Sequence, residues 1–134
     1  MSHSTNYTDT FISVAPDYRL GIAVIPEKPG SVAKRQYDLL IAAPYTMTSD
    51  DLLFSVYAQR QAIPIAQQSE ARAQFFAKPQ ACLRASPLAK THGWGLHHDG
   101  EGRVALCARE SPDYARFLSG KAGEIVAAMR SKRA

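Results

Sequence analysis

The sequence predicts an α+β fold in which a small, largely antiparallel sheet is covered by about four to five helices. Two observations lead to this prediction. Residues 94–98 and 103–109 alternate in hydrophobicity on either side of a glycine-rich turn, as the strands of a hairpin do. Residues 31–77 show successive helical periodicities separated by prolines. The expected architecture is a two-layer sandwich with the helices mostly on one side.

The length and composition favour a single domain over residues 1–134. The chain has 134 residues, of which 46% are hydrophobic and 21% charged, as in soluble globular proteins. We expect residues 1–9 to be a flexible polar segment and residues 130–134 to be a basic tail.

The same composition bears on localisation and partners. No apolar run approaches the roughly 20 residues of a membrane span, and the N-terminus lacks a secretory pattern. The two cysteines do not make a disulfide framework, so we expect a cytoplasmic protein with no membrane partner. The formal net charge of +4 is concentrated at the closing MRSKRA, where it also matches a helix dipole. Because no nucleic-acid-binding motif is present, we expect no nucleic-acid partner.

The N-terminal third begins with two extended runs. Residues Thr10–Val14 alternate and predict a short strand, which a turn at Pro16 ends. Residues Gly21–Pro26 are rich in β-formers and predict either a second strand or an extended crossing. Ser31 is a suitable N-cap for a helix that runs to about Ala43.

Two further helices follow. Thr48 or Ser49 can cap the first, with Asp50 and Asp51 placing negative charge on its first turn. We assign these carboxylates to capping rather than to metal binding or catalysis. One face of this helix carries apolar residues and ends in an arginine: Leu53, Val56, Tyr57 and Arg60. The next helix is expected at about Gln67–Ala77.

The C-terminal half contains the hairpin and three short helices. Residues 81–84 predict a short strand, and Ser86 with Pro87 opens a single helical turn that ends at Gly93. Ser111 and Pro112 open another helix in the same way, and Gly120 ends it. A last helix is expected at about residues 123–132, with Ile125, Val126 and Met129 buried.

Three stretches of the chain resemble a known family. The strings LLFSVYAQRQ, CLRASPLAKTHGWGLHHDGEGRVAL and MRSKR are similar to a small microbial protein family whose function is unknown. The resemblance covers nearly the whole chain and implies a complete single-domain protein. It implies no activity, substrate, cofactor or catalytic residue.

The first functional hypothesis is a non-catalytic module that binds a small anionic ligand or a protein partner. Arg84, the Ser86 hydroxyl and the free amides of the turn opened by Pro87 are expected to converge, with Lys90 one helical turn further on. The glycines beside Trp94 would leave the His97 face of the strand open to a ligand. The candidate binding residues are therefore Arg84, Ser86, Lys90, Trp94 and His97. In the alternative interpretation, Arg84 pairs with a carboxylate of this chain and holds the turn in place.

The second hypothesis is a small enzyme that uses Cys82, His97 or His98. Cys82 and Arg84 would share a strand face, and a nearby cation can lower the pKa of a thiol. Adjacent residues on a strand point to opposite faces, so His97 and His98 do not suit one metal ion, and we expect no metal site.

The third hypothesis is an interaction protein that works by assembly, as a homodimer formed through a sheet edge. The identity of any ligand or cofactor does not follow from the residues.

Overall fold

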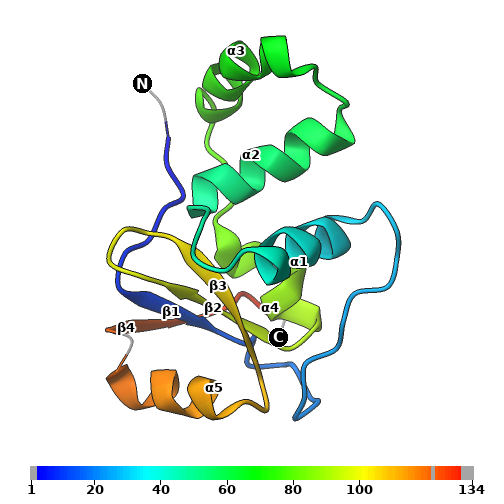
Figure 1. The fold of residues 1–134 in the computed structure, drawn as a ribbon. Coiled ribbons are helices and arrows are strands. Elements are labelled where there is room, and N and C mark those ends of the chain that lie inside the picture. The colour runs from blue at the N-terminus through cyan, green and yellow to red at the C-terminus, as the bar shows by residue number, and fades with distance from the viewer. Residues whose placement is uncertain (1–2, 122, 131–134) are drawn as a thin grey trace.

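Four strands form one mixed sheet in the computed structural model, which describes residues 3–121 and 123–130 (Figure 1). The strands are β1 (Thr10–Ser13), β2 (Trp94–His98), β3 (Val104–Ala108) and β4 (Glu124–Ala127). Their order is β3-β2-β1-β4, with antiparallel β3–β2 and β2–β1 pairs and a parallel β1–β4 pair. The predicted α+β class is confirmed, and the one parallel pairing makes the sheet mixed.

The helices form two groups along the chain, one between β1 and β2 and the other between β3 and β4. They are α1 (Val32–Ala42), α2 (Ser49–Arg60), α3 (Ile65–Phe76), the 3₁₀ turn η1 (Leu83–Ala85), α4 (Pro87–Thr91), α5 (Pro112–Arg116) and the π-type turn η2 (Phe117–Lys121). Serine or threonine side chains cap α1, α2, α4 and α5 at the positions that the sequence predicts. None of the described helices is both long and apolar enough to cross a membrane.

The two faces of the sheet carry different packing. Figure 1 shows α1 and α4 on one face, α5 on the other, and α2 with α3 stacked beyond α1. Ile12 and Leu96 contribute to the main core beneath α1 and α4, whereas Phe11 and Cys107 pack with Tyr114 of α5. The helices therefore lie mostly on one side, as expected, with α5 as the exception.

The prediction of a last helix at residues 123–132 is wrong where the structure describes it. Glu124–Ala127 is strand β4, and Ile125 and Met129 are 38% and 51% exposed rather than buried. The backbone edge of β1 supplies the hydrogen-bonding partners, which outweigh the helical spacing of three apolar residues. Residues 131–134 of the predicted helix and basic tail lie outside the described part of the chain.

Two other extended runs are not strands. Residues 81–84 were expected to form a strand, but Leu83–Ala85 is a 3₁₀ turn that leads into the cap of α4. Gly21–Pro26 is the extended crossing rather than the second strand. The Val24 amide donates to the His92 carbonyl (2.7 Å), and the Trp94 indole nitrogen donates to the Val24 carbonyl (2.9 Å).

The described part of the N-terminal segment lies along the start of α2. The Thr5 side chain is buried and donates to the Asp50 carboxylate (2.7 Å), and the His3 amide donates to the Phe76 carbonyl (2.7 Å). The predicted flexibility of residues 1–9 stays a prediction, and residues 1–2 lie outside the described ranges.

Candidate functional site

The Ser86 hydroxyl is engaged within the fold. Ser86 is the N-cap of α4 and accepts a hydrogen bond from the Leu88 amide (3.1 Å). It also donates to Oε1 of Gln36 in α1 (2.6 Å), and its side chain is 4% exposed. Because this hydroxyl already donates one hydrogen bond and accepts another, and is almost fully buried, it is poorly placed to bind a ligand.

The Arg84 side chain fastens β4 to η1. Its Nε donates to the Ala127 carbonyl (2.7 Å), and the Arg84 carbonyl accepts from the Met129 amide (2.8 Å). Of the two interpretations of Arg84, these contacts agree better with the one in which the arginine holds the turn in place. Its partner, however, is a backbone carbonyl rather than a carboxylate.

The remaining predicted binding residues do not all lie together. Lys90 is half-buried on α4, and Trp94 packs its ring against Tyr37 of α1. His97 lies on the opposite face of β2, where it stacks on Phe117 with ring centroids 4.1 Å apart. The sheet thus separates His97 from the other four, and anion binding by this set stays a prediction.

His97 is paired with a tyrosine held in an uncommon backbone conformation. Its Nδ1 lies 2.8 Å from the hydroxyl of Tyr45, whose φ of 57° is left-handed. Burial lowers the pKa of His97, Arg116 adds to this, and the carboxylates of Asp99 and Asp9 oppose it. The balance of these effects favours the neutral form of the His97 ring.

His98 faces the main core and is completely buried. Its ring lies edge-on to Tyr7, with centroids 5.4 Å apart, and its Nε2 has no hydrogen-bond partner among the described residues. Burial is the main cause that lowers the pKa of His98 to about 4. This histidine can therefore accept a proton only at a large cost in stability.

The two cysteines lie on opposite faces of the sheet. Cys82 Sγ is 3.2 Å from the Tyr7 hydroxyl, and burial followed by this contact raises the pKa of Tyr7 to about 12. Cys107 is buried on the α5 face, and burial raises the pKa of its thiol. Cys82 lies on the His98 side, so the structure does not bring it together with His97.

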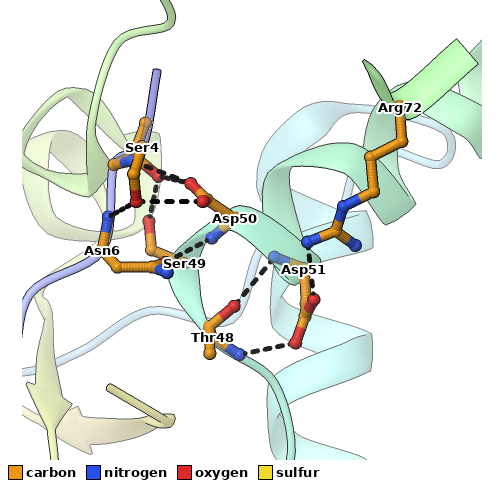
Figure 2. Close-up of polar contacts among 8 residues, drawn as sticks. Ser4, Asn6, Thr48, Ser49, Asp50, Asp51 and Arg72 are labelled. Carbon is orange, nitrogen blue, oxygen red and sulfur yellow. Dashed lines mark hydrogen bonds and ion pairs between the residues drawn. The ribbon is translucent and has the colours of Figure 1, made fainter. Parts of the chain in front are cut away.

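Asp50 and Asp51 hold neighbouring elements together at the start of α2. Figure 2 shows their carboxylates pointing to different sides of the helix. Asp50 accepts from Ser4 (3.0 Å) and Thr5, while Asp51 completes a capping box with Thr48. Asp51 also pairs with Arg72 of α3 (2.9 Å). Burial alone would raise the pKa of Asp51, but the hydrogen bonds from Thr48 and Arg72 lower it.

No metal centre is evident in residues 3–121 and 123–130. No three side chains among the histidines, cysteines and carboxylates there are grouped as metal ligands.

A cavity with a volume of about 650 Å³ lies along α1. Its cationic side chains already have partners within the fold. Lys34 Nζ pairs with Asp38 (2.7 Å), and Arg35 donates to the Gly30 carbonyl (3.2 Å) and to Gln59 (3.0 Å).

A smaller cavity of about 180 Å³ lies where α1, α2 and α3 meet. We call it the Gln36 cavity. Its apolar walls are Val32, Leu53, Val56, Tyr57 and Phe75. Its polar lining is Gln36, Arg60 and Gln61.

The Gln36 cavity differs from the larger one in having donors that are not engaged. Gln36 is 2% exposed, and its Oε1 accepts from Ser86, yet its Nε2 donates to no described residue. Arg60 forms no hydrogen bond or ion pair within residues 3–121 and 123–130. A guanidinium and an amide donor at the end of an apolar cavity are suited to an anion with an apolar body.

The sequence contains a signal for this site. On periodicity alone, this signal predicts only the apolar face of a helix. Leu53, Val56, Tyr57 and Arg60 were expected on one helical face, and all four line the Gln36 cavity. The signal is the arginine that follows the apolar residues on that face, because it places an exposed cation beside an apolar surface.

Comparison with known proteins places the chain in one family and gives no nearer relative. No curated protein and no solved structure matches it. The model of a family of unknown function, DUF6157, matches residues 2–134. This match agrees with the resemblance carried by the sequence strings around Arg84 and Trp94. The chain therefore belongs to DUF6157, a family of unknown function.

Proposed function

We propose that this protein is a non-catalytic binding protein for a small anionic ligand with an apolar or aromatic body. The ligand would occupy the Gln36 cavity, with its anionic group on Arg60 and on Nε2 of Gln36. The observation that carries this proposal is a side chain 2% exposed whose amide donor is unbonded while its acceptor is engaged by Ser86. Among the described residues, Nε2 of His98 is the buried side-chain nitrogen without a partner, so Nε2 of Gln36 is open to the solvent in the cavity, and a ligand acceptor would replace that solvent.

The size of the cavity limits the ligand. A volume of about 180 Å³ holds a group about as large as a benzoate ion, and less than a drug-sized molecule. Tyr57 and Phe75, whose ring centroids are 4.6 Å apart, form an aromatic wall for a planar group.

The test uses benzoate, cyclohexanecarboxylate and inorganic phosphate as probes in thermal-shift and calorimetric titrations. Benzoate is expected to stabilise the protein saturably, by about 2.7 kcal/mol at a hundredfold excess over Kd. Arg60→Ala should weaken benzoate binding by about 2 kcal/mol, or roughly thirtyfold.

Two arginine variants serve as matched controls. Arg35→Ala removes a cation from the cavity along α1, and Arg84→Ala removes the one in the turn that the sequence favoured. Both should bind benzoate as the wild type does. The proposal fails if no probe binds, or if Arg60→Ala binds them as the wild type does. Loss of binding in Arg84→Ala alone would return the site to the turn.

A second candidate function is self-association through the crossing at residues 20–25. Leu20, Ile22 and Ile25, which fall within one short stretch of the chain, are 54%, 55% and 53% exposed. The backbone beneath them is held, because the Tyr18 hydroxyl donates to the Ile22 carbonyl (2.6 Å). A rigid apolar patch can meet its own copy across a twofold axis. Sedimentation should then show a dimer that Ile22→Asp converts to a monomer, and a strict monomer at high concentration excludes this candidate.

A further inference from the structure

Tyr57 and Phe75 stand between two cavities. On one side lies the Gln36 cavity, and on the other lies a cavity of about 540 Å³ that also has Tyr57 and Phe75 in its lining. We call the second one the Lys78 cavity, and its other lining residues are Ala71, Gln74, Lys78 and Gln80. Because the same two rings line both cavities, a ligand that extends past them would enter the larger one.

Each of the two cavities has one cation that the fold does not engage. Arg60 serves the Gln36 cavity, and Lys78 forms no hydrogen bond or ion pair with any residue in the described ranges. Gln80 Nε2 is already engaged, since it donates to the Phe75 carbonyl (2.7 Å), and the other polar side chains of the lining, Tyr57 and Gln74, carry no positive charge. Lys78 is therefore the group in this cavity that can take up an anion.

A third cavity beside Tyr57 has the opposite charge. It is lined by Ile63, Gln67 and Glu70, together with Ala71 and Gln74. The Glu70 carboxylate would repel an anionic group at that end. Charge thus favours extension of an anionic ligand towards Lys78 rather than towards Glu70.

We propose that the ligand of this protein is an elongated dianion with a planar core, which runs from Arg60 past Tyr57 and Phe75 to Lys78. One anionic group lies on Arg60 and Gln36, the core lies against the aromatic pair, and the second anionic group lies on Lys78. This inference rests on the proposed function, because it extends the same site and names the class of ligand.

The contribution expected from Lys78 is smaller than that from Arg60. Both side chains are exposed, but Lys78 contacts its anion as a point charge, whereas Arg60 has a planar guanidinium and shares its cavity with a second donor, the amide of Gln36. A second anionic group of suitable reach should therefore tighten binding by about five- to tenfold. That gain should shrink as salt is added.

The experiment measures binding of benzoates that carry a second carboxylate on a 4-alkyl chain of increasing length. Each dicarboxylate is compared with the same compound in which the terminal carboxylate is a carboxamide, so that only the second charge differs. At least one chain length should bind about five- to tenfold more tightly as the dicarboxylate. Lys78→Ala should abolish that gain, and Lys28→Ala, at an exposed lysine outside the site, should keep it.

The outcomes separate this inference from the function on which it rests. If benzoate binds through Arg60 but no dicarboxylate exceeds its carboxamide, the extension to Lys78 is wrong and the proposed function stands. The same conclusion follows if the gain survives Lys78→Ala. If neither benzoate nor any longer compound binds, both proposals are wrong.

Discussion

The turn at Arg84–Ser86 and the Gln36 cavity contain the same kinds of groups and differ in whether those groups have partners. Both hold an arginine and a neutral polar side chain. In the turn, Arg84 donates to the Ala127 carbonyl and Ser86 is bonded on both sides. In the cavity, Arg60 and the amide nitrogen of Gln36 bond to no described residue. One side chain belongs to both places, because the acceptor of Gln36 faces Ser86.

The difference shows that residue type identifies what a group can bind, while its neighbours in the fold decide whether it is available. An engaged polar group should affect stability when it is removed, and an available one should affect ligand binding. The following predictions test that distinction, beginning with the largest effect.

His98 has no access to solvent, its Nδ1 lies 3.1 Å from the Leu96 carbonyl oxygen and its Nε2 has no partner among the described residues, so it should act on stability alone. The unfolded chain takes up a proton near pH 6.5, whereas the folded protein does so only near pH 4. The free energy of unfolding should therefore fall by about 3 kcal/mol as the pH decreases from 6.5 to 4. The measurement is urea unfolding across this range for the wild type and for His98→Leu.

The difference between those two curves isolates His98 from the carboxylates that titrate in the same range. As the pH decreases, the free energy of unfolding should fall more steeply for the wild type than for His98→Leu. Parallel curves would show that His98 takes up its proton equally well in the folded and the unfolded protein. That result would contradict the lowered pKa of His98 in the folded state.

Ser86 and Ser111 form a matched pair for the next effect. Both open a short helix before a proline, and both accept a bond from an amide of its first turn. Ser111 donates to a backbone carbonyl, whereas Ser86 donates to the buried Gln36. Ser86→Ala should cost about 2 kcal/mol and Ser111→Ala about 1 kcal/mol, as measured by urea unfolding. Equal losses would mean that the bond to Gln36 contributes nothing beyond capping.

The smallest expected changes in stability are those that distinguish Arg84 from Arg60. Arg84→Ala should cost about 1 kcal/mol and should speed amide hydrogen exchange in β4, because the bond to Ala127 is lost. Arg60→Ala should change stability by less than about 0.5 kcal/mol. Mass-detected hydrogen exchange and urea unfolding supply the two readouts. If Arg60→Ala lost as much stability as Arg84→Ala, Arg60 would be engaged within the fold, which would contradict its role as an available cation in the Gln36 cavity.

The parts of the fold that the sequence predicted well are those set by nearby residues. The hairpin of β2 and β3 follows from alternation and from the glycine-rich turn, both within a few residues of each other. The starts of α1, α2, α4 and α5 follow from caps that contact amides of their own first turn.

The errors arise where a distant segment decides the outcome. Ile125, Val126 and Met129 have helical spacing, but pairing with β1 makes Glu124–Ala127 a strand. At the candidate site, the partners of Ser86 and Arg84 come from α1 and β4, which no local pattern identifies. The helical face ending in Arg60 was visible in the sequence, but its role depends on Gln36 and Phe75 from two other helices.

The parallel pair between β1 and β4 has a consequence for how the protein folds. β1 is an inner strand made early in synthesis, and its two neighbours are β2 and β4, of which β4 lies near the other end of the chain. Contacts of such long sequence separation form slowly, because the loop between them must close first. Until residues 124–127 leave the ribosome, one edge of β1 stays open, and an open edge invites pairing with another chain. The helices from α1 to α3 can form during that interval, so the walls of the Gln36 cavity can be in place before the sheet is complete.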